Sequence, residues 1–153
     1  MDIEAKLNEM GLVLPEVTAP IAAYVPAVRS GNLLFVAGQL PVRGGKLLAT
    51  GKVPSQVSVE NAKEAAGQCA INALAIVKQE LGGDWSRLVR VVRVGAFVQS
   101  DDSFIEQATV ANGASELLLA ILGDIGRHAR LSVGTNSLPR GASVEVEFIF
   151  EIR

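Results

Sequence analysis

The sequence predicts an α+β domain in which two long helices cover one face of a mixed β-sheet. Three observations lead to this expectation. Apolar residues recur at three- and four-residue steps over residues 58–81 and again over 103–122, a spacing typical of amphipathic helices. Apolar and acidic residues alternate over 143–152, as in a strand with one buried face. Shorter strand patterns flank both helices, so the expected order is (α)ββαβαββ, in which the first helix is short.

The first part of the chain predicts a short helix followed by two strands. Residues 2–11 carry apolar side chains at helical spacing and end at a glycine, whereas 14–20 are expected to be irregular. Residues 22–29 and 32–42 are predicted as strands joined by a Ser-Gly-Asn turn. A second turn is expected at 43–46.

The first long helix is expected to begin after Ser58, whose side chain can cap it, and to end at the glycine pair 82–83. Its apolar stripe consists of Ala62, Ala66, Cys69, Ala73, Val77 and Leu81. Because Cys69 lies within this stripe, we expect it to be an inert core residue rather than a nucleophile. After the helix, Asp84 is expected to cap a short helical turn and Trp85 to pack over the core.

The second half of the chain predicts another long helix among strands. Ser103 and Glu106 have the spacing of a capping box and are expected to begin the helix over 103–122. The other segments are a valine-rich strand over 89–100, a strand over 130–135, a turn over 138–141 and the alternating strand over 143–152. Since two helices can cover only one face of the sheet, the other face is expected to be solvated or a subunit interface.

Length, composition and charge limit the classes of protein to consider. The 153 residues fit a single domain over 1–153, with 1–19 as a helical extension and loop. The net charge is −2 and no basic stripe is present, so nucleic acid is not an expected partner. One cysteine cannot form an intrachain disulfide, and one histidine with one cysteine argues against a conventional metal site.

The sequence also favours a soluble cytoplasmic protein. No apolar run approaches the roughly 18–20 residues of a membrane span, so no membrane association is expected. The N-terminus is acidic and mixed, unlike a signal or transit peptide. No dinucleotide-binding, phosphate-loop or nucleophile-elbow motif is present.

Arg130 is the first candidate for chemistry. It ends a local cluster of positive charge at 126–130 and enters a strand on which Ser132 and Gly134 share its face. A guanidinium can bind a carboxylate through two parallel hydrogen bonds. From spacing alone, the alternative for Arg130 is a surface arginine that pairs with a nearby acidic side chain. For His128, the alternative to a catalytic role is that of an ordinary loop histidine.

Glu145 and Glu147 are the second candidates, because they lie on one face of the last strand. Simple alternation on a solvated face would give the same pattern. A partly buried carboxylate can instead position water or transfer a proton. An arginine and a glutamate on neighbouring strands that face one way could bind an acid substrate and carry out proton chemistry beside it.

Four segments together resemble a known family. They are GQLPV at 38–42, ARLSV at 129–133, LP at 138–139 and VEVE at 144–147. Their order and spacing over roughly residues 20–152 resemble the reactive intermediate deaminase A family, also called YjgF/YER057c/UK114 or endoribonuclease L-PSP-like. The N-terminal extension and the GRHAR stretch resemble a longer-chain subgroup of it.

The resemblance implies a chorismate-mutase-like fold and a homotrimeric barrel with clefts between neighbouring subunits. It also implies a cofactor-independent enzyme that hydrolyses reactive enamine or imine intermediates, of the 2-iminobutanoate and 2-iminopropanoate type, to 2-keto acids and ammonia. The expected partners are therefore a small 2-imino or 2-keto acid and two further copies of the chain.

The resemblance also implies roles for particular residues. Arg130 matches the arginine that binds the substrate carboxylate, and Glu145 matches the glutamate associated with the attacking water. The other pocket residues implied are Tyr24, Gly38, Gln39, Asn112 and Ser132. Two departures bear on activity: Ala37 stands where serine is frequent, and Ser132 where cysteine is frequent.

Two other functions stay open at this point. One is a non-catalytic trimer that binds or senses a small carboxylate through the same arginine, which the missing hydroxyl at Ala37 favours. The other is RNA cleavage, an activity associated with the family. The acidic chain, with one Trp, one Tyr and five Phe, argues against RNA cleavage.

Overall fold

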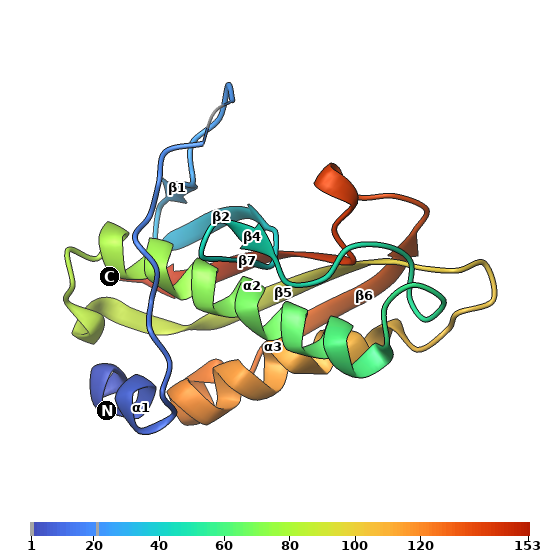
Figure 1. Cartoon of the computed structure of the whole chain (residues 1–153). Coiled ribbons are helices and arrows are strands. Elements are labelled where there is room, and N and C mark those ends of the chain that lie inside the picture. Colours follow the sequence, from blue (N-terminus) through green and yellow to red (C-terminus); the bar gives the residue numbers. More distant parts are fainter. Residues whose placement is uncertain (1, 21) are drawn as a thin grey trace.

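The computed structural model describes residues 2–20 and 22–153, so Met1 of the expected extension lies outside the described residues. A five-stranded sheet in the order β1-β2-β7-β5-β6 forms its centre, and helices lie on one face (Figure 1). The helices are α1 (Ile3–Glu9), α2 (Val59–Glu80) and α3 (Gln107–Leu122), with 3-10 turns η1 (Trp85–Arg87), η2 (Gly123–Gly126) and η3 (Pro139–Gly141). The strands are β1 (Ala27–Ser30), β2 (Leu33–Gln39), β3 (Val42–Arg43), β4 (Lys46–Leu47), β5 (Leu88–Gln99), β6 (Ala129–Thr135) and β7 (Val144–Ile152).

The sheet is mixed, as the sequence predicted. β5 and β6 are parallel, whereas β1 with β2, β2 with β7, and β7 with β5 are antiparallel. Along β7 every second residue from Val144 to Ile152 is buried, and the residues between them are half-buried. The buried set faces α2 and α3, so the period-2 pattern fixes which face of the sheet meets the helices.

The two long helices approach each other closely because small residues lie between them. A Cβ atom on Gly113 of α3 would overlap the backbone carbonyl of Lys63 in α2. Cys69 is buried in the apolar stripe of α2, which confirms the core role expected for it. Burial raises the pKa of the Cys69 thiol, so the thiol stays protonated.

The helical segment Gln107–Gly126 is long and apolar enough to cross a membrane by length and composition, which corrects the expectation that no such segment exists. It contacts α2, β5 and β6, and its buried side chains form one stripe. That arrangement is typical of a core helix in a globular domain.

Several predicted boundaries shift in the structure. The strand expected over 22–29 begins only at Ala27, since Pro26 has no N–H to donate to a ladder. The strand expected over 32–42 ends at Gln39, after a bulge between Val36 and Gln39. α3 begins at Gln107 rather than at 103, so the predicted capping box is wrong.

Other local predictions are confirmed. The Ser58 side chain accepts a hydrogen bond from the N–H of Asn61 at the start of α2. Asp84 caps η1 by accepting from the N–H of Ser86. The predicted N-terminal helix is α1, and its Glu4 carboxylate contacts the Lys78 ammonium at 2.7 Å.

Candidate functional site

The residues predicted for the site fall into two groups on different strands of the sheet. Arg130 and Ser132 lie on β6, next to Asn112 on α3. Gly38 and Gln39 end β2, and Tyr24 lies shortly before β1. β7 and β5 separate β2 from β6, so three strand spacings, about 14 Å, lie between the two groups.

Arg130 is held by hydrogen bonds from α3. Its Nη1 donates to the Asn112 Oδ1 at 2.7 Å and to the Ser115 Oγ at 3.1 Å. Among residues 2–20 and 22–153, its Nε and Nη2 make no hydrogen bond. These two nitrogens form the side of the guanidinium that binds a carboxylate with two parallel bonds, so the side chain is oriented with that side free.

His128 belongs to the same cluster. Its Nδ1 lies 2.6 Å from the Gly126 carbonyl oxygen and its Nε2 lies 2.9 Å from the Ser115 Oγ. Because a carbonyl can only accept, Nδ1 carries the proton and Nε2 accepts from the Ser115 hydroxyl. Burial and the positive charge of Arg130 lower the pKa of His128, so the imidazole is neutral near pH 7.

Ser132 adds a buried polar atom next to this cluster. It lies two residues after Arg130 on β6 and therefore on the same face. In the described part of the chain, its buried Oγ has no hydrogen-bond partner. Buried hydroxyls are normally satisfied, so this oxygen is available to a ligand or a bound water.

Glu145 packs against Gly38 on the open face of the sheet. A Cβ atom at Gly38 would overlap the Oε1 of Glu145, so only glycine leaves room for the carboxylate there. Burial, and then the charge of Glu147, raise the pKa of Glu145. Glu147 itself pairs with the Arg93 Nη1 at 2.8 Å, which leaves Glu145 as the uncompensated carboxylate of the two.

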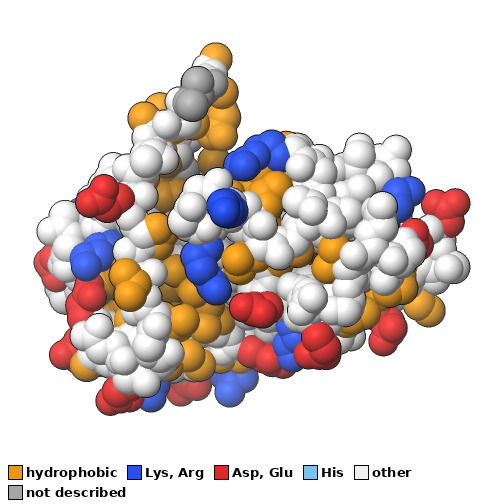
Figure 2. All heavy atoms as spheres, in the orientation of Figure 1, with side chains coloured by type: hydrophobic (Ala, Val, Ile, Leu, Met, Phe, Trp, Pro, Cys, Tyr) orange, Lys and Arg blue, Asp and Glu red, His pale blue; other side chains and the backbone are white. Residues whose placement is uncertain are grey.

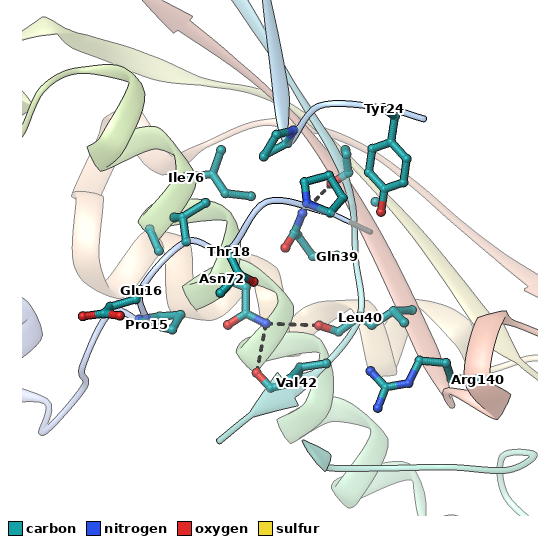
Figure 3. Close-up of a pocket in the computed structure, with 16 residues that line it drawn as sticks. Pro15, Glu16, Thr18, Tyr24, Gln39, Leu40, Val42, Asn72, Ile76 and Arg140 are labelled. Carbon is teal, nitrogen blue, oxygen red and sulfur yellow. Dashed lines mark hydrogen bonds between the residues drawn. The ribbon is translucent and has the colours of Figure 1, made fainter. Parts of the chain in front are cut away.

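A cleft of about 340 Å³ lies beside Gly38 (Figure 3). Tyr24, Gln39 and Arg140 line it together with residues of α2 and of the N-terminal segment. The structure thus brings Tyr24, Gly38 and Gln39 together in the lining of one cleft.

The structure corrects one expectation about this site. Arg130 and Glu145 do not lie on neighbouring strands, because β5 lies between β6 and β7, and the register of the strands places them on opposite faces of the sheet. Arg130 pairs with the buried Val94, on the helix-covered face, whereas Glu145 pairs with Phe97 on the open face. Within one chain, these two side chains cannot contact the same small molecule.

Sequence reasoning missed four residues in or beside these two groups. Ser115 lies three residues after Asn112 on α3, and that spacing alone could have placed it beside Asn112. Asn72 and Gln68 are an i, i+4 polar pair on an otherwise apolar helix, which is a signal of the same kind. Nothing in the sequence around Arg140 indicates more than a turn.

The described residues hold no cluster of three or more His, Cys, Asp or Glu that could bind a metal ion. The polar groups present suit an anionic organic ligand better: one oriented arginine, several hydroxyl and amide groups, and a carboxylate with a raised pKa.

Comparison with known proteins places this arrangement in a family. A family model described as "YjgF/chorismate_mutase-like, putative endoribonuclease" matches residues 4–152. Protein TCP17 of Trypanosoma cruzi is 42% identical over 151 residues, which cover 98% of this chain and 94% of that protein.

Two solved structures are similar over almost the whole chain. The protein Atu1372 of Agrobacterium tumefaciens, described as of unknown function, is 50% identical with a TM-score of 0.92, over 99% of this chain and 94% of that one. A "putative endoribonuclease" of Shewanella oneidensis MR-1 is 33% identical with a TM-score of 0.93, over 98% and 99%. The chain therefore belongs to the YjgF/chorismate mutase-like family and has the fold of that family.

Proposed function

We propose that this protein is a cofactor-independent hydrolytic deaminase of small 2-imino acids, with a site formed between two copies of the chain in a homotrimer. The observation that carries the proposal is the orientation of Arg130. Its Nη1 is held by Asn112 and Ser115, while Nε and Nη2 are left for a substrate carboxylate.

Glu145 supplies the proton chemistry. Water adds to the imine carbon as the Glu145 carboxylate accepts a proton from it. That proton passes to nitrogen, so that a carbinolamine forms. Its hydroxyl proton then moves to nitrogen through the same carboxylate as C=O forms and the C–N bond breaks, and ammonia leaves behind a 2-keto acid. A carboxylate whose pKa is raised toward the working pH suits this exchange, which contributes about 10²–10⁴-fold in such reactions.

The need for a second copy follows from the separation of Arg130 and Glu145 on opposite faces of one sheet. Apolar side chains on the open face and before β1 are exposed and available for contact: Tyr24 (57%), Val25 (56%), Phe35 (43%) and Leu131 (43%). The described residues just before β1, 22–26, project from the body of the molecule and carry mainly hydrophobic side chains (Figures 1 and 2). Exposed apolar groups of this kind favour a subunit interface.

The assay uses an imine that is generated in place. A serine or threonine dehydratase releases 2-aminoacrylate or 2-iminobutanoate, and semicarbazide traps the imine that is not yet hydrolysed. We expect the wild-type protein to accelerate keto-acid formation and the Arg130→Ala variant to lose this effect. Native mass spectrometry is expected to give the mass of a trimer, whereas a stable monomer would contradict the shared site.

One observation favours a second candidate, a carboxylate-binding trimer without catalysis. Ala37 lines the cleft and offers no hydroxyl to a substrate or water. This alternative predicts no acceleration of imine hydrolysis. It predicts instead that keto acids raise the thermal stability of the wild-type protein but not of Arg130→Ala.

In either case the buried free thiol of Cys69 is compatible with the reducing cytoplasm, where we place the protein.

A further inference from the structure

We infer that the cleft beside β2 is a subsite for a second acidic group and that Arg140 selects 2-imino acids whose side chain ends in a carboxylate. The inference deepens the proposed function and rests on it for the reaction, but not for the binding of the ligand. Three features carry it: the backbone at Arg140, the free guanidinium, and the position and size of the cleft.

Arg140 has an unusual backbone. Its φ is 58° and its ψ is 14°, and no other non-glycine residue in the described ranges has a positive φ. The left-handed region is costly for a residue with a long side chain. Two hydrogen bonds hold the turn. The Gly141 N–H donates to the Leu138 carbonyl oxygen at 3.0 Å, and the Gly51 N–H donates to the Gly141 carbonyl oxygen at 2.8 Å. The fold therefore imposes this conformation on an arginine where glycine or asparagine would be relaxed.

The Arg140 guanidinium has no partner among the residues that the structure describes. Within residues 2–20 and 22–153 it makes no hydrogen bond and no ion pair. Figure 3 shows the side chain reaching from η3 toward Leu40 and Val42 at one end of the cleft. Glu16, the acidic residue of the lining, lies at the opposite end with its carboxylate directed away (Figure 3). The positive charge at the Arg140 end is therefore not neutralised.

The wall of the cleft is rigid next to Arg140. The Asn72 Nδ2 donates to the carbonyl oxygens of Leu40 and Val42, both at 3.1 Å. The Gln68 Nε2 in turn donates to the Asn72 Oδ1 at 2.8 Å, and the Arg43 Nε donates to the Gln68 Oε1 at 2.9 Å. This chain of side-chain bonds fixes the loop after β2, so the cleft is already formed without a ligand.

Gly38 connects the cleft to the reacting carboxylate. It lines the cleft, and Glu145 packs directly against it. Glu145 itself does not line the cleft, so we place the imine carbon at the Glu145 carboxylate and only the substrate side chain in the cleft, where it extends past Gly38 toward Arg140. A volume of about 340 Å³ is in the range of pockets for small metabolites and exceeds what a three- or four-carbon imine fills.

The first test measures binding by titration calorimetry with two product analogues of equal chain length, 2-oxoglutarate and 2-oxopentanoate. We expect the wild-type trimer to bind 2-oxoglutarate about tenfold or more tightly, the range expected for one hydrogen-bonded charge pair. Arg140→Asn, which tolerates the left-handed backbone, is expected to remove this preference. Arg140→Lys should keep part of it. Lys46→Gln removes a positive charge on β4 that does not line the cleft, and it should leave the preference unchanged.

The second test compares hydrolysis of the imines that an amino acid oxidase makes from glutamate and from norvaline, which has the same chain length. Arg140→Asn is expected to lower kcat/KM about tenfold for the glutamate-derived imine only. Equal affinities in the wild type, an unchanged preference in Arg140→Asn, or equal losses for both imines would overturn the inference. If the wild type hydrolyses neither imine, the proposed function fails, and the calorimetric preference still decides the role of Arg140.

Discussion

The two groups of candidate residues differ in how far the fold has already organised them. Around Arg130, hydrogen bonds from Asn112 and Ser115 fix one side of the guanidinium, and His128 fixes the Ser115 hydroxyl. Around Glu145 the opposite holds. Among the residues described, no donor binds its carboxylate, and burial raises its pKa.

This difference matches the two tasks that the proposed function assigns. A group that binds a carboxylate gains affinity when its orientation is fixed beforehand. A group that exchanges a proton with water works best when its charge is not stabilised, because its pKa is then closer to the working pH. Variants of the two groups should therefore change different kinetic parameters.

Glu145→Gln should have the largest effect. The amide cannot accept a proton from water, so we expect kcat to fall about 10²–10⁴-fold while KM changes little. Steady-state kinetics with a trapped imine measure both parameters. Glu147→Gln is the matched control on the same strand face, since Glu147 pairs with Arg93. An equal loss of kcat in both variants would argue that the face as a whole, not Glu145, carries the effect.

The same Glu145→Gln substitution should stabilise the fold at neutral pH. Because the folded-state pKa of Glu145 lies above its ordinary value of 4.5, its contribution to stability is complete below pH 4.5 and is lost as the pH rises through the folded pKa. Glutamine has no such loss. We therefore expect the melting temperature of the variant relative to wild type to be higher at pH 7 than at pH 4. A constant difference would show that Glu145 is not destabilised by burial.

Gly38→Ala should have the second-largest effect. The added Cβ would overlap the Glu145 Oε1 and displace the carboxylate. A misplacement of about 1 Å can cost about 10²-fold, so kcat should fall by that order while the fold persists. Gly95→Ala is the matched control, because its added Cβ would press on Glu147 rather than on Glu145. A Gly38→Ala variant that keeps full activity, and whose crystal structure shows Glu145 unmoved, would contradict the packing argument.

Substitutions of the residues that hold Arg130 should have smaller effects, which appear in KM. Ser115→Ala removes one of the two acceptors of Nη1, so we expect KM to rise about three- to tenfold with kcat almost unchanged. Ser115→Thr keeps a hydroxyl and should restore much of the affinity. A fall in kcat at constant KM would place Ser115 in the chemistry rather than in binding.

His128 should make substrate affinity depend on pH. Its folded pKa lies below 6.5, so its contribution to stability is present above pH 6.5 and is lost as the pH falls through the folded pKa. Once protonated, Nε2 can no longer accept from Ser115. KM should therefore rise below pH 6.5 in the wild type, and the rise should be weaker in His128→Gln, whose amide oxygen is an acceptor at every pH.

Much of the fold could be predicted from the sequence because burial imposes a local period. The alternation in β7 and the stripe in α2 need no knowledge of distant partners, and the caps at Ser58 and Asp84 act within three residues. Pairing between distant segments has no such signature. The insertion of β5 between β6 and β7, and the register that puts Arg130 and Glu145 on opposite faces, are properties of the whole sheet.

The candidate site shows the same limit. The residues named from the resemblance lie in two real groups, but their neighbours come from elsewhere in the chain. The contact between Ser115 and His128 joins the middle of α3 to the start of β6. The left-handed backbone of Arg140 results from hydrogen bonds to a loop about 90 residues away in the sequence, and no local pattern indicates it.

Complementation between two inactive variants tests the shared site most directly. Arg130→Ala and Glu145→Gln chains, co-expressed with different tags and purified through both, form mixed trimers. If each site takes Arg130 from one copy and Glu145 from its neighbour, about a third of the sites in the doubly purified mixed trimers, one site in each trimer, regain both residues. We predict that mixed trimers recover a corresponding fraction of wild-type imine hydrolysis, while each variant alone stays inactive. Mixed trimers as inactive as their parents would contradict a site built from two chains.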